Sequence, residues 1–408
     1  MTLIYPFKTK KFLDQFTYES SVMPFGDNLL HDLDLAVNSF EKSVKDPNIE
    51  KYLISKNELF ASFAISKAEN SALTMTEAKE LWERINNNPD FDLLSAKIKS
   101  GIDLTQKDHD KLEFVNIVKT FRKFNERIYS LTEYTPELIL SIHKQLTSGL
   151  DLFSNYLLGF DLYKSGTWRD NNDIRVGNYV PPEHGLIKDL VTTILNWIKN
   201  AIPTPLNVGI FHTAMYATHP FNNGNKRVCR ILEHMLYRSI GFNKNNLYGT
   251  SYYYHLEKER YYKHLLYSIE HANLNQFTAY SLEALAYSQI GVFKTSLEIK
   301  KEEYLHSKID NLQIVKIFTP FVKRSEIQFK NLLKITKNKI SRPTLVTYLQ
   351  KAVSEQVLAR RLSGKNAYYS LNVDASQEQN AYNLWMKKVK EYLPYVPPEY
   401  KAQVSLQV

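Results

Sequence analysis

HPFNNGNKRVCR, residues 219–230, places one histidine, one glycine and three cations in a single short stretch. It follows an apolar segment, NVGIFHTAMYAT, and continues into VCRILEHMLYRSIGF, and both segments have the apolar content of buried helices. Gly224 lets the backbone approach an anion closely, and the N–H groups of Asn225 and Lys226 would begin the second helix, where free N–H groups and the positive end of the helix dipole meet. The stretch therefore predicts two helices joined by an anion-binding loop. The alternative is an ordinary polar turn that caps a helix.

The charged side chains of this stretch suit chemistry at phosphorus. Arg227 and Arg230 are three residues apart, so they would project from one helix face and could clamp phosphates. His219 stands at the other end of the loop, where an imidazole could accept the proton of an incoming nucleophile. We therefore expect a loop that holds a polyphosphate and a displacement at a phosphorus atom with His219 as the base.

The composition indicates a folded protein of more than one domain. The chain has 408 residues, of which 43% are hydrophobic, and a formal net charge of +9. No apolar run approaches the roughly 20 residues that span a bilayer, so no membrane contact is expected. The single cysteine, Cys229, excludes an intrachain disulfide framework and a cysteine-rich zinc site. The first residues lack the apolar core of a secretory signal. We expect a reducing, cytoplasmic compartment, and delivery into a host cell stays open.

The remaining segments predict an all-α protein with small β features. Residues 1–109 are expected to form a helical region and residues 110–295 a helical core that contains the loop. Within this core, SGTWRDNNDIRVGNYVPPEHG has the turn residues and short alternating runs that are typical of a hairpin flap. Residues 296–372 show helix, turn, helix and a hairpin, which is the order of a winged helix-turn-helix. Residues 373–408 would add a helix and a tail.

Positive charge concentrates in residues 321–371, which hold eleven Lys or Arg and two Glu, while the rest of the chain is nearly neutral. A localised basic segment indicates an anionic partner. The second helix of this segment would enter the major groove of duplex DNA, and the wing would meet phosphate. The alternative is a basic solvated face or a protein-docking module. The candidate DNA contacts are Arg342, Thr347, Lys351, Arg360, Arg361 and Lys365.

Residues 219–230 resemble the Fic motif, H-x-F-x-[DE]-G-N-G-R-x-x-R. In that family a helical core transfers a nucleotide monophosphate, usually AMP from ATP, to a hydroxyl of a protein. The resemblance covers roughly residues 110–275. It implies a protein adenylyltransferase that uses ATP and Mg²⁺ and modifies a Ser, Thr or Tyr hydroxyl of a protein partner; a homodimer stays open. The matching positions are His219, Phe221, Gly224, Asn225, Arg227 and Arg230.

The resemblance also implies roles for individual residues. His219 would be the general base, and Arg230 would hold the distal phosphate. EKERYYKHL, which contains Tyr261 and Tyr262, resembles the helix that borders the adenine. The phosphate-binding loop would be formed by Gly224, Asn225, Lys226 and Arg227. The flap would dock the target segment in an extended form, and its candidate residues are Ile174, Val176 and Gly177.

Two positions depart from the motif. The acidic position, which binds Mg²⁺ in family members, is Asn223, and a neutral amide oxygen is a weaker ligand for a hard dication than a carboxylate. The second glycine of the motif is Lys226, whose ammonium could meet phosphate oxygens directly. We expect nucleotide binding, while the metal requirement, the rate and the favoured direction of the reaction are left open.

ISKAEN, residues 65–70, resembles in part the inhibitory-helix motif [ST]-x-x-x-E-[GN] of Fic proteins whose inhibitor precedes the core. Glu69 and Asn70 match, whereas Ile65 stands at the leading position. We expect Glu69 to reach Arg230 and to occupy the place of the γ-phosphate. In a second enzyme reading, Glu69 aligns a water that removes AMP from the modified protein. In a third reading, the chain is a DNA-binding regulator whose core only senses nucleotide.

Overall fold

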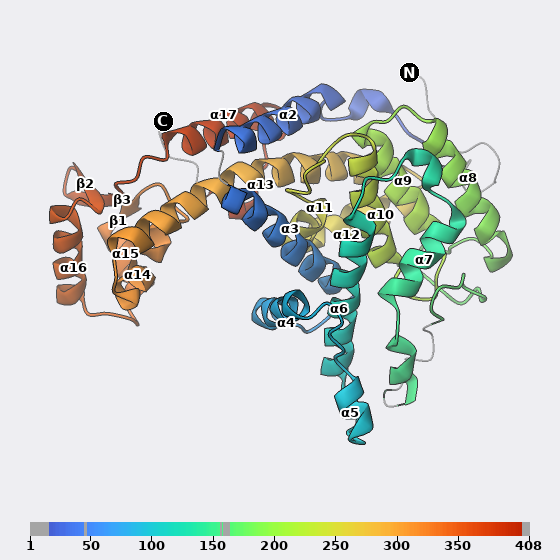
Figure 1. Cartoon of the computed structure of the whole chain (residues 1–408). Helices are drawn as coiled ribbons and strands as arrows, with labels where there is room; N and C mark the ends of the chain where they lie inside the picture. Colours follow the sequence, from blue (N-terminus) through green and yellow to red (C-terminus); the bar gives the residue numbers. More distant parts are fainter. Residues whose placement is uncertain (1–15, 45–46, 156, 158–163, 402–408) are drawn as a thin grey trace. The chain divides into compact units, whose positions relative to one another are not determined.

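The computed structural model of the chain describes residues 16–44, 47–155, 157 and 164–401 (Figure 1). The first residues, on which the expectation about a secretory signal rests, lie outside this part. The chain divides into two compact units, Met1–Gln289 and Ile290–Val408. The predicted N-terminal region and most of the predicted core thus share one unit, and the predicted boundaries at residues 110, 296 and 373 stay predictions. Among the described residues, no helix combines the length and the apolar character needed to cross a membrane.

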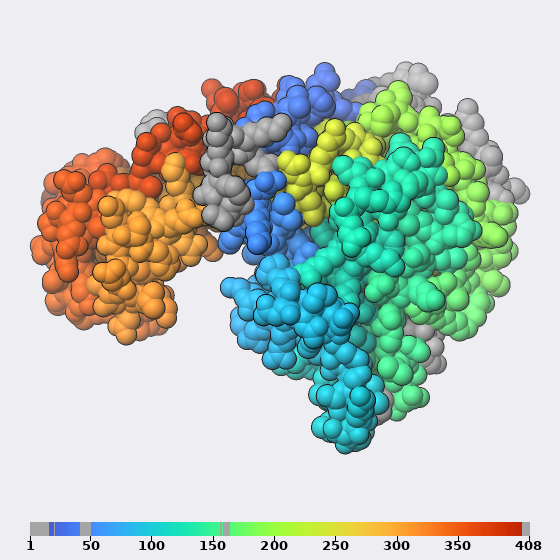
Figure 2. Space-filling model, viewed as in Figure 1, coloured from blue at the N-terminus to red at the C-terminus, as the bar shows by residue number. Residues whose placement is uncertain are grey.

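The first unit is built from helices, and Figures 1 and 2 show α5, in cyan, at one extremity of it. The last helix of the unit, α13, begins at Asn275 and continues to Lys308, beyond the boundary between the units. The α-helices before it are α2 (Asp27–Val44), α3 (Pro47–Lys67), α4 (Met75–Asn87), α5 (Ser95–Lys99), α6 (Gln106–Asn125), α7 (Pro136–Leu146), α8 (Ile187–Asn200), α9 (Pro205–Thr218), α10 (Asn225–Ser239), α11 (Thr250–Leu256) and α12 (Lys258–Glu270). Short 3-10 helices are η1 (Ser20–Val22), η2 (Leu131–Glu133), η3 (Leu150–Asn155) and η4 (His184–Leu186).

The two helices expected on either side of the loop are α9 and α10. Thr204 caps α9 through its side chain, and Pro205 occupies the first turn, where its missing N–H has no consequence. The side chains from residue 208 to residue 218 are all buried, so α9 is a central helix of the first unit. It packs against α10, where His212 Nδ1 contacts the Glu233 carboxylate and both side chains are fully buried. This buried polar contact fixes how the two helices, and hence the ends of the loop, lie relative to each other.

The second unit contains a small antiparallel sheet with strand order β1-β3-β2. In its register Ile327 lies opposite Tyr369, and Leu358 lies opposite Leu371. The elements are α14 (Leu312–Phe318), η5 (Thr319–Phe321), β1 (Ile327–Gln328), α15 (Phe329–Thr336), α16 (Arg342–Ser354), β2 (Leu358–Ser363), β3 (Asn366–Leu371), α17 (Ser376–Tyr392) and α18 (Pro398–Lys401). The expected order of helix, turn, helix and hairpin is present as α15, α16, β2 and β3. Its interpretation as a winged helix stays a prediction.

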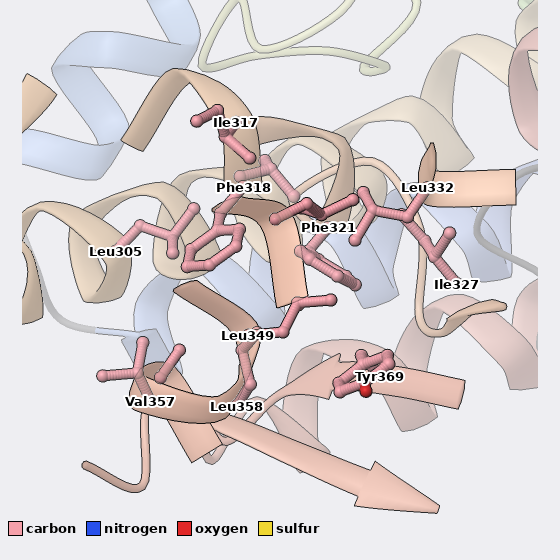
Figure 3. Packing of buried hydrophobic residues seen from close by; sticks show 13 residues of the cluster. Leu305, Ile317, Phe318, Phe321, Ile327, Leu332, Leu349, Val357, Leu358 and Tyr369 are labelled. Atoms are coloured by element: carbon pink, nitrogen blue, oxygen red, sulfur yellow. The ribbon is translucent and has the colours of Figure 1, made fainter. Parts of the chain in front are cut away.

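The core of the second unit lies between these helices and the sheet. Figure 3 shows Phe321, Leu349 and Tyr369 gathered there, and Phe321 and Leu349 are almost completely buried. Each large side chain buried in this way stabilises the unit by about 1.5–3 kcal/mol. The predicted fold class is confirmed, because helices dominate the described residues and the named strands form one small sheet.

Candidate active site

The loop between α9 and α10 has the backbone that the sequence predicts for an anion site. His219 ends α9 in the left-handed region, with φ 49°, and Gly224 precedes α10 with φ 80°. A Cβ at position 224 would lie 3.3 Å from Nη2 of Arg227, so both the conformation and the space favour glycine. Asn225 closes the loop, because its side chain accepts from the N–H of Phe221 at 3.0 Å and donates to the Phe221 carbonyl at 2.8 Å. Its side chain therefore shapes the loop, and its backbone N–H begins the helix.

The Phe221 side chain holds the loop down. It is completely buried and stacks on His143 of α7 with 3.8 Å between ring centroids. His143 Nδ1 accepts from the N–H of Gly166 at 3.0 Å, so its Nε2 carries the proton and donates to the Asn223 carbonyl at 3.1 Å. Burial lowers the pKa of His143 to about 3, which keeps this neutral tautomer.

His219, the predicted base, lies at the end of α9; the residue as a whole is partly exposed, but the Nδ1 atom of its imidazole is buried. Removal from water lowers the pKa of His219 to about 3; the Tyr216 carbonyl opposes this shift, and the positive charges of Arg169 and Lys226 add to it. The imidazole is therefore neutral at physiological pH and has a lone pair that can accept a proton. A bound polyphosphate would raise this pKa, because a nearby negative charge favours the protonated form.

Arg169 is a buried residue of the site that sequence reasoning missed. Its Nε donates to the His219 carbonyl at 2.8 Å and its Nη1 to the Asn171 carbonyl at 2.6 Å, while Nη2 donates to the Pro182 carbonyl. Its own N–H donates to the carbonyl of Pro220 at 2.8 Å. One guanidinium thus ties the loop between α9 and α10 to both ends of the flap. No signal in the sequence marks it, since it stands in a turn-rich segment among other polar residues.

The flap is present as a tight hairpin. Val176 and Tyr179 form an antiparallel bridge, and Gly177 has φ 62°. The N–H of Asn178 donates to the Glu270 carboxylate at 2.8 Å, and a Cβ on Gly177 would lie only 2.6 Å from the same oxygen. Val176 is buried and Ile174 is partly exposed, so these two predicted docking residues differ in access. Their role in docking a target stays a prediction.

The expectation that Arg227 and Arg230 form one clamp is not met by the geometry. Arg227 is completely buried, and its Nη1 lies 3.1 Å from Oε2 of Glu113 in α6. Burial raises the pKa of Glu113 to about 7, although the Arg227 charge opposes that shift. Arg230 instead donates from Nη1 to the Ala64 carbonyl at 2.9 Å. The two guanidinium groups differ because α6 offers a buried carboxylate to one, and the end of α3 offers a carbonyl to the other.

Arg230 also lies against aromatic rings of α11 and α12. Its guanidinium carbon is 4.6 Å from the centre of the Tyr261 ring and 5.5 Å from that of Tyr254. Tyr261 is fully buried, and its hydroxyl lies 3.4 Å from His212 Nε2, so Tyr261 packs behind Arg230. Tyr262 is partly exposed and lies on the side of Lys226, whose ammonium is 5.1 Å from the ring centre. Of the two tyrosines expected beside an adenine, only Tyr262 is accessible.

The end of α3 and the turn after it, residues 64–70, cover these cations and are called the closing turn below. The Ala68 carbonyl accepts from the Tyr262 hydroxyl at 2.8 Å and from Lys226 Nζ at 3.4 Å. Glu69 contacts Lys226, with 3.5 Å between Oε2 and Nζ. The expected Glu69–Arg230 contact is therefore replaced by a Glu69–Lys226 pair. Arg230 instead donates a hydrogen bond to a backbone carbonyl of α3.

Asn70, the other residue of the partial inhibitory motif, ends the closing turn in the left-handed region with φ 64°. Asparagine tolerates this conformation better than most residues. Its Oδ1 accepts from Lys258 Nζ, at the start of α12, at 3.0 Å. Lys258 is a second residue that sequence reasoning missed; its only sequence signal is its place three residues before the Tyr261-Tyr262 pair.

The residues at the loop do not fit a magnesium ion. The Oδ1 atom of Asn223 accepts from the N–H of Gly224 at 2.6 Å and from Arg227 Nη2 at 3.1 Å. Its other arm is an amide nitrogen, which donates and cannot bind a cation. Within the part of the chain that the structure describes, no three His, Cys, Asp or Glu side chains gather into a group that could hold a metal ion.

The candidate DNA contacts in the second unit are all exposed, but they are not equally available. Arg361 forms two hydrogen bonds with the Glu326 carboxylate, at 2.9 and 2.7 Å, and lies over the Tyr368 ring. Lys351 lies 3.7 Å from Glu355 on the same helix. The exposed candidates are Arg342, Thr347, Lys351, Arg360, Arg361 and Lys365. Their role in DNA binding stays a prediction.

Comparisons with known proteins agree with the loop's geometry. Residues 133–237 match the family model described as Fic/DOC family. A probable protein adenylyltransferase of Aquifex aeolicus (strain VF5) is 30% identical over 139 residues, which are 33% of this chain and 42% of the relative. The match thus spans less than half the length of that protein.

Solved structures of Fic proteins are also similar to this chain. A Fic family protein from Desulfovibrio desulfuricans has 17% identity and a TM-score of 0.47, with 86% of this chain and 98% of that one covered. A Fic-domain-containing signaling protein from Bacteroides thetaiotaomicron has 14% identity and a TM-score of 0.45, with 65% of this chain and 95% of that one covered. From the family match and the loop geometry, residues 133–237 of this chain are a Fic/DOC domain.

Proposed function

We propose that this chain is a protein adenylyltransferase that transfers AMP from ATP to a Ser, Thr or Tyr hydroxyl of a protein. The observation that carries the proposal is the loop between α9 and α10, with a neutral imidazole at one end and a helix N-terminus with Lys226 and Arg230 at the other. A helix start with two nearby cations suits a polyphosphate. A neutral histidine suits the removal of a hydroxyl proton. The similarity to a probable protein adenylyltransferase supports the same reaction.

The proposed transfer balances with the groups at hand. The target hydroxyl oxygen attacks the α-phosphorus of ATP and forms a new phosphorus–oxygen bond. The bond between the α-phosphorus and the bridging oxygen of the β-phosphate breaks, and pyrophosphate leaves. The hydroxyl proton passes to His219. Arg169 keeps the His219 backbone in place through its carbonyl, so it acts as a positioning residue and not as a reacting group.

The closing turn would restrain this reaction. Lys226 and Arg230, which the polyphosphate needs, already contact the Ala68 and Ala64 carbonyls and the Glu69 carboxylate. Nucleotide must therefore displace these oxygens before its phosphates can bind. The restraint then comes from the backbone of the closing turn as well as from Glu69.

A second reaction direction is favoured by the place of Glu69. Its carboxylate lies beside Lys226 at the edge of the loop, where it could orient a water toward the phosphorus of an AMP-modified side chain. Water would then supply the attacking oxygen, and the protein hydroxyl would leave with AMP released. One chain can use both directions, because the same carboxylate can hinder the triphosphate and assist the water.

The test of the proposed function is the intact mass of the purified protein, and of a mixture of bacterial proteins, after incubation with ATP. We expect a mass increase equal to one AMP group, and none with His219→Ala. The Glu69→Gly variant serves as the derestrained form. Absence of any AMP-modified protein with both the wild type and Glu69→Gly would refute the transferase activity.

A further inference from the structure

Asn223 limits the form in which a nucleotide can bind at the loop. Its side-chain oxygen has two acceptor sites. Both are taken, by the Gly224 N–H and by Arg227 Nη2. Since both contacts are donors, the hydrogen-bond network itself places the oxygen on this side of the amide and the nitrogen on the other. Neither arm of the side chain offers a lone pair to a cation.

The Arg227 guanidinium, which donates to the Asn223 side-chain oxygen, is itself held in place. Arg227 is completely buried, and its Nη1 is 3.1 Å from the Glu113 carboxylate, which is 3% exposed. Removing either partner of such a buried pair leaves an uncompensated buried charge, which is strongly destabilising. Arg227 therefore stays at Asn223, and a dication beside the amide oxygen would face a permanent positive charge. The Glu113 carboxylate is also committed to this pair.

Lys226 supplies positive charge on the accessible side of the loop. Its side chain is 21% exposed, and its ammonium lies over the Tyr262 ring and against the closing turn. An ammonium is a compact point charge that can meet several phosphate oxygens. The Lys258 ammonium also lies over this ring, 5.9 Å from its centre. Against these two ammonium groups the closing turn contributes one carboxylate, Glu69, so the region has an excess of positive charge.

We propose that the loop binds ATP without a divalent cation, with the Lys226 ammonium neutralising the phosphates in its place. This inference rests on the proposed function, because it specifies the form of that nucleotide substrate. A metal-free triphosphate carries more negative charge than its magnesium complex. It therefore gains more from the Lys226 and Lys258 charges and meets no competing dication near Arg227.

The test is calorimetric titration of ATP into the full chain, once with excess EDTA and once with excess Mg²⁺. It is done in the wild type and in Glu69→Gly, in which the closing turn carries no carboxylate. We expect the affinity for ATP in EDTA to be at least equal to that in Mg²⁺, and up to about tenfold higher. Lys226→Met should weaken binding in EDTA by about tenfold, while Lys226→Arg, which keeps the charge, should retain it. This pair separates the charge from any effect of the substitution on folding.

Asn223→Asp is the matched gain-of-metal variant. One carboxylate oxygen can keep the contacts with Gly224 and Arg227, and the second oxygen replaces the amide nitrogen and can bind Mg²⁺. We expect this variant to bind ATP about tenfold more tightly with Mg²⁺ than in EDTA, and to show Mg²⁺ binding without nucleotide. If the wild type itself binds ATP about tenfold more tightly with Mg²⁺, the inference is wrong, while the proposed function stands. If ATP binds under neither condition in either background, the proposed function and the inference both fall.

Discussion

The Glu69→Gly substitution removes the one negative charge of the closing turn. The carboxylate is 3.5 Å from the Lys226 ammonium, and both side chains are 21% exposed. A phosphate that took over this ammonium would lie about 6 Å from the carboxylate, and two like charges at that distance repel by about 3 kcal/mol at an effective dielectric constant of about 20. Loss of the competing ion pair adds at most about 1 kcal/mol. Together these two terms would give at most about 1000-fold, and because both side chains are partly exposed and screened by ions, we expect a gain in AMP transfer of about 10- to 100-fold.

The assay measures the rate at which label from ATP enters the chain and its targets. Glu69→Gln is the matched variant, since it keeps the size of the side chain and removes only the charge. It should give a gain close to that of Glu69→Gly. Glu80→Gln, on an exposed position of α4, removes an equal charge away from the loop and should change nothing. Because part of the repulsion is screened by ions, the gain should shrink as salt is raised.

The reverse direction is measured on the same variants by loss of label from a premodified protein. If Glu69 orients the attacking water, both substitutions should abolish this loss while transfer increases. A change of less than about threefold in both directions, for both variants, would refute the electrostatic argument. The restraint would then lie in the backbone of the closing turn alone, and the partial match at Glu69 would have no functional meaning.

The other predictions concern the base, its support, the second unit and acid stability. His219→Ala should lower the transfer rate by about 10²–10⁴-fold and leave the calorimetric affinity for ATP unchanged; normal turnover would remove it from the mechanism. Arg169→Lys should slow transfer with little change in ATP affinity, because one ammonium cannot reproduce the three-way fork to carbonyl groups; an unchanged rate would refute its positioning role. If the second unit binds duplex DNA, anisotropy titrations should show affinity that falls steeply with salt and that Arg360→Glu weakens on all sequences alike; binding that is independent of salt would point to a protein partner. Burial lowers the pKa of His143 and His219 to about 3 and of His234 and His255 to about 4, so at these four groups only the unfolded chain binds protons as pH falls from about 6.5 to 4. Glu113, whose pKa is raised to about 7, binds a proton in the folded chain and offsets one of them. Urea unfolding should therefore show a loss of about 1.4 kcal/mol per pH unit for each net proton over this window, and a flat profile would contradict the burial of these histidines as neutral groups.

The loop and its flanking helices could be predicted because their signals are local. Thr204 and Pro205 start α9, Gly224 takes the left-handed conformation before α10, and the cations follow within two turns. Each of these effects acts between residues that are neighbours along the chain, so the sequence carries it directly. The tight hairpin of the flap was predictable for the same reason, since Gly177 supplies its left-handed residue.

The partners of the charged groups could not be predicted in this way. Helical spacing indicates which side chains share a face, but it does not say which distant element covers that face. The sequence therefore suggested a single Arg227–Arg230 clamp. In the structure Arg227 instead pairs with Glu113 of α6, and Arg230 donates to a backbone carbonyl at the end of α3. Backbone carbonyls carry no sequence signal at all, because every residue has one.

The sequence by itself determined the match to the family motif, the two helices beside the loop and the position of the predicted base, since these follow from local conformation and from residues in one stretch. Only the tertiary structure decided which cations remain accessible to a phosphate. Lys226 is partly exposed beside Glu69, while Arg227 is buried against Asn223. The physical reason is that the availability of a charge depends on the oxygens that surround it, and those oxygens come from helices far apart along the chain.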